Sequence, residues 1–126
     1  MPKQILSTPH GPAAMGPYSI ATEANGLVFC SGMVALVPET GEAITGSVTD
    51  QTHQVMKNIG AVLGDVGLGY DDIVKTTIFL ADIDDFAAVN EVYAQYVGEA
   101  KPARSTFQAG ALPGGFQVEI ECIAAR

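Results

Sequence analysis

Residues 116–123 have the sequence Phe-Gln-Val-Glu-Ile-Glu-Cys-Ile, in which apolar and polar side chains alternate. Successive side chains of a β-strand point to opposite faces of the sheet, so this alternation predicts a strand with one apolar face and one acidic face. The apolar face has to be covered by other elements of the fold. The stretch therefore indicates a sheet with helices packed on one side.

Two upstream segments have the period of helices that would provide this cover. Residues 49–66 repeat apolar side chains at three- and four-residue spacing, and Thr49 or Asp50 is expected to cap the first turn. A second helix is expected to follow Asp84 or Asp85. The two apolar stripes consist of Val55, Met56, Ile59, Val62, Leu63 and Val66, and of Phe86, Val89, Tyr93 and Tyr96.

The remaining strands are indicated by β-branched segments and turn signals. Residues 18–24 and 27–33 flank Asn25-Gly26, a pair that accepts the positive φ angles of a hairpin turn. Residues 73–80 predict a well-buried strand, and residues 104–109 a short one. We therefore expect a single α+β domain over the 126 residues, with a mixed sheet of about six strands and two helices on one face.

The amino-acid composition indicates which classes of binding partner the protein can have. The chain is 48% hydrophobic and only 16% charged, whereas ordinary domains have roughly 25% charged residues. Such sparse charge suggests that part of the surface meets another subunit. The net charge of −8 disfavours nucleic-acid binding. No apolar run resembles a signal peptide or a membrane span, so we expect a soluble cytoplasmic protein.

Arg104 is the strongest candidate for chemistry, because it begins a predicted strand in a chain with six cations. A guanidinium can bind a carboxylate through two parallel hydrogen bonds; the alternative is a salt bridge to one of the fourteen acids. Glu119 and Glu121 share the acidic face of the last strand, either as a proton-handling pair or as a solvated surface.

Other polar groups give weaker signals. Tyr18, Ser31 and Asn90 lie next to turns or on helix faces, and Gly32 would let backbone approach a ligand closely. Cysteine and histidine are too widely spaced for a metal site, and both cysteines, Cys30 and Cys122, are expected to be buried. Spacing alone thus predicts an oligomeric α+β domain that binds a small anion.

The chain resembles the reactive intermediate deaminase family, also called the RidA or YjgF family. The resemblance rests on segments in the family's order over nearly the whole chain. They are Gly16-Pro17-Tyr18, Ser31-Gly32, Pro38-Glu39-Thr40-Gly41-Glu42, Asp72-Ile73-Val74-Lys75-Thr76-Thr77, Phe86-Ala87-Ala88-Val89-Asn90, Pro102-Ala103-Arg104-Ser105-Thr106, Leu112-Pro113 and Val118-Glu119-Ile120-Glu121-Cys122-Ile123-Ala124.

The resemblance implies a fold like that of trimeric chorismate mutases, with clefts between neighbouring subunits of a homotrimer. It also implies hydrolysis of 2-aminoacrylate, 2-iminopropanoate or 2-iminobutanoate to keto acids and ammonia, without a metal or organic cofactor. By the same resemblance Arg104 would bind the substrate carboxylate and Glu119 would activate water. Tyr18, Asn90 and the backbone around Ser31-Gly32 and Thr106 would contact the substrate.

Thr106 departs from the family pattern, which often has Cys there, so a thiol-dependent role would be lost. The alternatives are a non-catalytic keto-acid sensor and an endoribonuclease or translation inhibitor. Chorismate mutase activity would rest on fold analogy alone.

Overall fold

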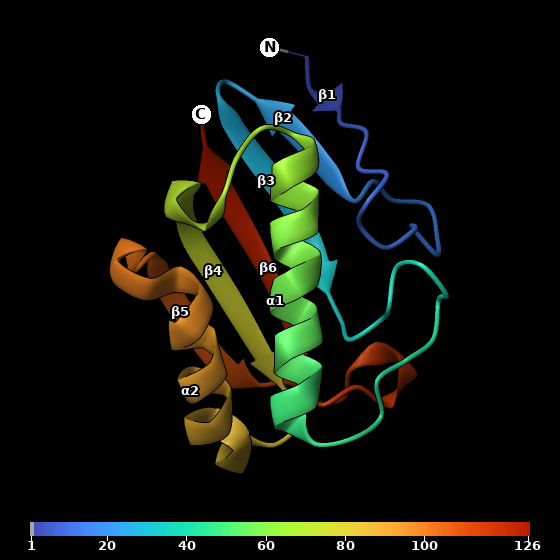
Figure 1. The fold of residues 1–126 in the computed structure, drawn as a ribbon, viewed down its shortest axis with the longest axis vertical. Helices are drawn as coiled ribbons and strands as arrows, with labels where there is room; N and C mark the ends of the chain where they lie inside the picture. Colours follow the sequence, from blue (N-terminus) through green and yellow to red (C-terminus); the bar gives the residue numbers. More distant parts are fainter. Residues whose placement is uncertain (1) are drawn as a thin grey trace.

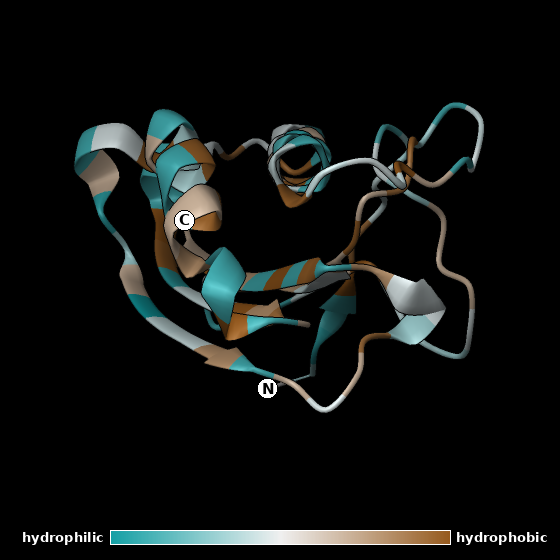
Figure 2. Ribbon diagram, turned by 90° about the horizontal axis from the view of Figure 1, so that it is seen from below, coloured by the Kyte–Doolittle hydropathy of each residue, from teal (hydrophilic) through white to brown (hydrophobic). Residues whose placement is uncertain are grey.

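The computed structural model describes residues 2–126 and has two helices on one side of a six-stranded sheet, in agreement with the predicted fold class. Figure 2 shows both helices above the sheet and none below it. The helices are α1 (Val48–Asp65) and α2 (Phe86–Val97). The strands are β1 (Gln4–Ile5), β2 (Ala21–Ala24), β3 (Leu27–Met33), β4 (Ile73–Leu80), β5 (Ala103–Gln108) and β6 (Val118–Ala125).

The sheet has the order β1-β2-β3-β6-β4-β5, and only the β4–β5 pair is parallel. Parallel neighbours need a crossover connection, which here is α2, so this helix packs beside α1 above the β4–β5 side of the sheet (Figure 1). The C-terminal strand β6 lies in the middle, between β3 and β4. β5 is an edge strand.

The core lies between the helices and the sheet. The alternation of β6 is confirmed, since every second residue from Val118 to Ala124 is buried beneath the helices, with Ile120 at 0% exposure. The α1 stripe is buried against this face from Val55 to Leu63 as the spacing predicts, whereas Val66 follows the helix and is only partly buried. The core-facing residues of these two elements are Val48, Val55, Met56, Ile59, Val62, Leu63, Val118, Ile120, Cys122 and Ala124.

Several local predictions need correction. Ser47, not Thr49 or Asp50, caps α1: its Oγ accepts a hydrogen bond from the Asp50 N–H at 3.1 Å. The segment predicted over 18–24 is a strand only at Ala21–Ala24, because the preceding residues form loop. β4 is buried on its helix face alone, so its run of β-branched residues does not mark a strand covered on both sides.

The opposite face of the sheet is uncovered and partly apolar. Leu27, Phe29 and Phe107 on this open face are 37%, 41% and 48% exposed. The hairpin prediction at Asn25-Gly26 is confirmed by φ angles of 54° and 78°. Within residues 2–126 no helix is both long enough and apolar enough to cross a bilayer.

Candidate active site

Arg104 lies on edge strand β5 beneath α2, with an exposed side chain. Its Nη1 donates a hydrogen bond to Asn90 Oδ1 at 2.6 Å. Its Cζ lies 5.5 Å from the ring centre of Phe86 and 5.3 Å from that of Tyr93. No acidic side chain of residues 2–126 lies within ion-pair distance of it, so the salt-bridge alternative is wrong for the single chain. The guanidinium lines a cavity of about 500 Å³.

Strand register places Arg104 on the helix side of the sheet. Arg104 is opposite Thr76 of β4, which is opposite Cys122 of β6, and both partners are buried beneath the helices. Directly opposed residues in neighbouring strands point to the same face. Thr106 also lies on this side, opposite Ile78, and its buried hydroxyl has no hydrogen-bond partner within residues 2–126.

Glu119 lies on the other side of the sheet. It is opposite Phe79, which is opposite Phe107, so these three form a row across the open face. The Glu119 carboxylate lines a cavity of about 590 Å³ together with Tyr18, Ser31 and Gly32. The other lining residues are Met15, Val34, Leu36, Pro113, Gly114 and Phe116.

The environment of Glu119 makes its carboxyl group harder to ionise than a fully solvated one. Burial raises the pKa of Glu119 above its usual 4.5, and the negative charge of nearby Glu121 raises it further. The carboxylate packs directly on the Cα of Gly32: a Cβ built there would lie 2.8 Å from Glu119 Cδ and still closer to Oε2. Gly32 therefore permits the close approach that partly removes this carboxylate from water.

The remaining predicted groups near Glu119 have defined partners. The Ser31 N–H donates to Ile20 O at 2.8 Å, and its hydroxyl donates to Ser19 O at 2.7 Å, so both donors are engaged within the chain. Tyr18 is half exposed, and its hydroxyl accepts a hydrogen bond from the Met15 N–H at 3.3 Å. Among these groups, the Glu119 carboxylate is the best placed to accept a proton.

The predicted residues thus form two groups. Tyr18, Ser31, Gly32 and Glu119 meet at the open side of the sheet, whereas Arg104, Asn90 and Thr106 lie on the helix side at the β5 edge. The two cavities share no lining residue. One chain alone does not bring Arg104 and Glu119 to the same ligand.

Sequence reasoning missed the aromatic neighbours of Arg104. Phe86, Asn90 and Tyr93 recur at spacings of four and three residues and so lie along one face of α2. The apolar stripe predicted from the sequence joins Phe86 and Tyr93 with Val89 and Tyr96 and leaves Asn90 out, although Phe86 is 38% exposed. The sequence signal that could have revealed the contact is the i, i+4, i+7 spacing itself, which puts the Asn90 amide on the same helix face as the two aromatic rings.

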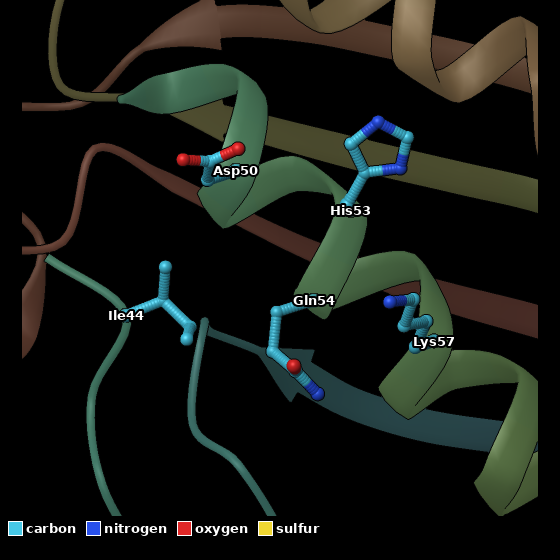
Figure 3. Close-up of a pocket in the computed structure, with 5 residues that line it drawn as sticks. All are labelled: Ile44, Asp50, His53, Gln54 and Lys57. Atoms are coloured by element: carbon cyan, nitrogen blue, oxygen red, sulfur yellow. The ribbon is translucent and has the colours of Figure 1, made fainter. Parts of the chain in front are cut away.

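Another surface pocket contains none of the predicted groups. Figure 3 shows Asp50, His53, Gln54 and Lys57 on α1, with Ile44 on the loop opposite. His53 Nδ1 lies 2.8 Å from the Tyr96 hydroxyl of α2, so this histidine joins the two helices. The pocket itself lies between α1 and the loop that carries Ile44.

Comparison with known proteins identifies the family. Residues 8–126 match the profile of the family described as Endoribonuclease L-PSP. The chain is 55% identical over 122 residues to Reactive Intermediate Deaminase A, chloroplastic, of Arabidopsis thaliana. The aligned region covers 97% of this chain and 65% of that protein. The chain belongs to the reactive intermediate deaminase family. The chain accounts for slightly less than two thirds of this relative's length.

Two further similar proteins are covered almost completely. The 2-iminobutanoate/2-iminopropanoate deaminase of Mus musculus is 43% identical over 122 residues, covering 97% of this chain and 90% of that protein. The crystal structure of E. coli TdcF with bound serine superposes with a TM-score of 0.91 at 39% identity, covering 98% of each chain. Family members are thus named as imine deaminases, and the expected fold is confirmed.

Proposed function

We propose that this protein hydrolyses small α-imino acids, such as 2-iminopropanoate and 2-iminobutanoate, and 2-aminoacrylate after tautomerisation, to keto acids and ammonia. The observation that carries the proposal is Arg104, which lines a cavity, is held by α2 and has no acidic partner among residues 2–126. Such a group suits a substrate carboxylate. The names of the plant and mouse relatives support the same reaction class.

The reaction needs orientation and one group that handles protons. Arg104 holds the substrate carboxylate through Nε and Nη2, since Nη1 already donates to Asn90. Glu119, as carboxylate, takes a proton from water as the water oxygen bonds to the imine carbon. The resulting carboxylic acid returns this proton to the imine nitrogen, which gives a carbinolamine. Glu119 then carries the proton of the new hydroxyl group to the same nitrogen, the C–N bond breaks, and the keto acid forms as ammonia leaves. A raised pKa suits this exchange near neutral pH.

Because Arg104 and Glu119 face opposite sides of the sheet, we infer that the working site lies between copies of the chain. One copy supplies Arg104 and Asn90, and its neighbour supplies Glu119 and Tyr18. The exposed apolar side chains of the open face, including Phe29 and Phe107, provide surface for association. A homotrimer with three such clefts fits the arrangement, and a cyclic assembly repeats the same contact at each interface.

A sensor of keto acids and an endoribonuclease are the competing functions. The net charge of −8 disfavours an RNA partner despite the family's L-PSP description. The sensor would use the same groups without turnover. In the cell, the proposed deaminase would protect pyridoxal-phosphate enzymes from reactive imines.

The test couples the protein to a threonine dehydratase and times keto-acid release against the spontaneous rate. Arg104→Ala should lower kcat/KM at least about 100-fold, since two charge-assisted hydrogen bonds of about 1.5–3 kcal/mol each would be lost. Arg104→Lys should lower kcat/KM nearly as much, because lysine keeps the positive charge but lacks the planar guanidinium that makes two parallel hydrogen bonds. Lys101→Ala, which removes another cation lining the same cavity, should retain activity.

Glu119→Gln should lower kcat more than it raises KM, because it removes proton transfer and not carboxylate binding. If the unmodified protein binds 2-oxobutanoate but does not accelerate imine hydrolysis, the keto-acid sensor becomes the favoured function. RNA cleavage that persists through purification and disappears in Arg104→Ala would favour the ribonuclease.

A further inference from the structure

We propose that Tyr93 is a positioning residue, which with Phe86 and Asn90 of α2 fixes the Arg104 guanidinium before a ligand arrives. The inference rests on the proposed function and concerns how its carboxylate site is built. These three α2 residues point toward β5 from successive turns of the helix.

The contacts restrain the guanidinium without neutralising it. Both aromatic rings lie within the roughly 6 Å range at which a ring face attracts a cation. Asn90 accepts one hydrogen bond through its amide oxygen, which carries no charge. None of the fourteen acids of the chain forms an ion pair with Arg104 in the structure of residues 2–126. The cation is thus oriented while its charge remains available to an anion.

Tyr93 is itself held at its far end. Its hydroxyl lies 2.7 Å from Thr76 Oγ1, and the two residues are 6% and 1% exposed. Thr76 is also the β4 residue directly opposite Arg104 in the parallel pairing of β4 with β5. The Tyr93 ring that contacts the guanidinium is therefore anchored to β4, the strand next to the one that carries Arg104. This anchor links α2 and Arg104 into one rigid unit.

Such an arrangement reduces the cost of binding. A long arginine side chain loses much rotamer freedom when it holds a ligand. If the folded protein has already imposed this order, binding of a carboxylate requires less additional ordering. Removing the ring should therefore weaken binding of substrate and product alike, raising KM while leaving kcat nearly unchanged.

The experiment compares three tyrosine variants. Tyr93→Leu removes the ring, and Tyr93→Phe keeps the ring but loses the Thr76 contact. Tyr96→Leu is the matched control, since Tyr96 lies on the same helix and contacts His53 and Tyr70 instead of Arg104. Calorimetry measures 2-oxobutanoate binding, and NMR of the Arg104 Nε–Hε group measures rotation of the guanidinium.

We expect Tyr93→Leu to weaken 2-oxobutanoate binding about tenfold and to speed guanidinium rotation, with a kcat within about twofold of the unmodified protein. Tyr93→Phe should restore most of the affinity, and Tyr96→Leu should bind as the unmodified protein does. If Tyr93→Leu does not fold, Phe86→Leu tests the other ring of the pair, with the same changes expected.

The two proposals can fail separately. Unchanged Arg104 rotation and unchanged affinity in folded Tyr93→Leu, or in its Phe86→Leu substitute, would overturn the positioning role whatever the deaminase assay gives. Faster rotation and weaker 2-oxobutanoate binding in a protein with no deaminase activity would uphold the positioning role and reject only the proposed reaction.

Discussion

A mixed-subunit experiment tests whether the site lies between copies of the chain. Arg104→Ala and Glu119→Gln chains are each expected to be inactive alone. When they assemble at random in equal amounts, a site is intact only if its arginine comes from a Glu119→Gln chain and its glutamate from an Arg104→Ala chain. Each condition holds for about half of the subunits, so about one quarter of the sites should be active, whatever the number of subunits in a closed ring.

The expected fraction of one quarter follows from the strand register. Arg104 shares a row with buried Thr76 beneath the helices, while Glu119 shares a row with Phe79 on the open face. A side chain does not cross the sheet. Two defective chains therefore restore activity only where the intact Arg104 of one chain meets the intact Glu119 of the other. If one chain supplied both groups, the mixture would be as inactive as its parents.

The assay co-expresses the two variants with different affinity tags and measures keto-acid release per subunit. Mass spectrometry of the intact assembly verifies that the subunits have mixed. The control pair is Arg104→Ala with Glu121→Gln, which should reach about one half, because only the source of the arginine then matters. Background activity in a verified 1:1 mixture of Arg104→Ala and Glu119→Gln would refute the intersubunit site.

Three further predictions concern the glutamate side of the site and the fold. Glu121→Gln should move the acid limb of the pH profile of kcat/KM to lower pH. Glu119 must be ionised to act, and its pKa is raised by burial and by the charge of Glu121, so removing that charge lowers the pKa of Glu119. An acid limb that does not move would contradict this coupling between the two carboxylates. Gly32→Ala should lower kcat/KM about 100-fold by displacing the Glu119 carboxylate, with circular dichroism unchanged; full turnover would show that the close packing is unimportant. Ser47→Ala should lower the free energy of unfolding by about 1 kcal/mol without affecting turnover, as denaturant titration would show, since an α1 N–H loses its cap.

The periodic parts of the fold were predictable, and their ends less so. Strands 27–33 and 73–80 were predicted with the bounds that the structure shows, because apolar or β-branched residues stand at both ends of each segment. The cap of α1 was misplaced because Ser47, Thr49 and Asp50 are all suitable cap residues, and only the folded backbone decides which side-chain oxygen accepts the bond.

For the candidate site, the sequence alone supplied residue types, the alternation of the last strand and the scarcity of cations. The alternation and the helical spacing predicted the α+β class, the scarcity of cations singled out Arg104, and the alternation placed Glu119 on the acidic face; the family resemblance then gave these two residues their expected roles. Tertiary structure alone decided which side of the sheet each residue occupies and that Phe86 and Tyr93 contact Arg104. The physical reason is that periodicity reports which face of its own element a residue occupies, whereas strand register and the crossover through α2 arise from contacts between residues far apart in the chain.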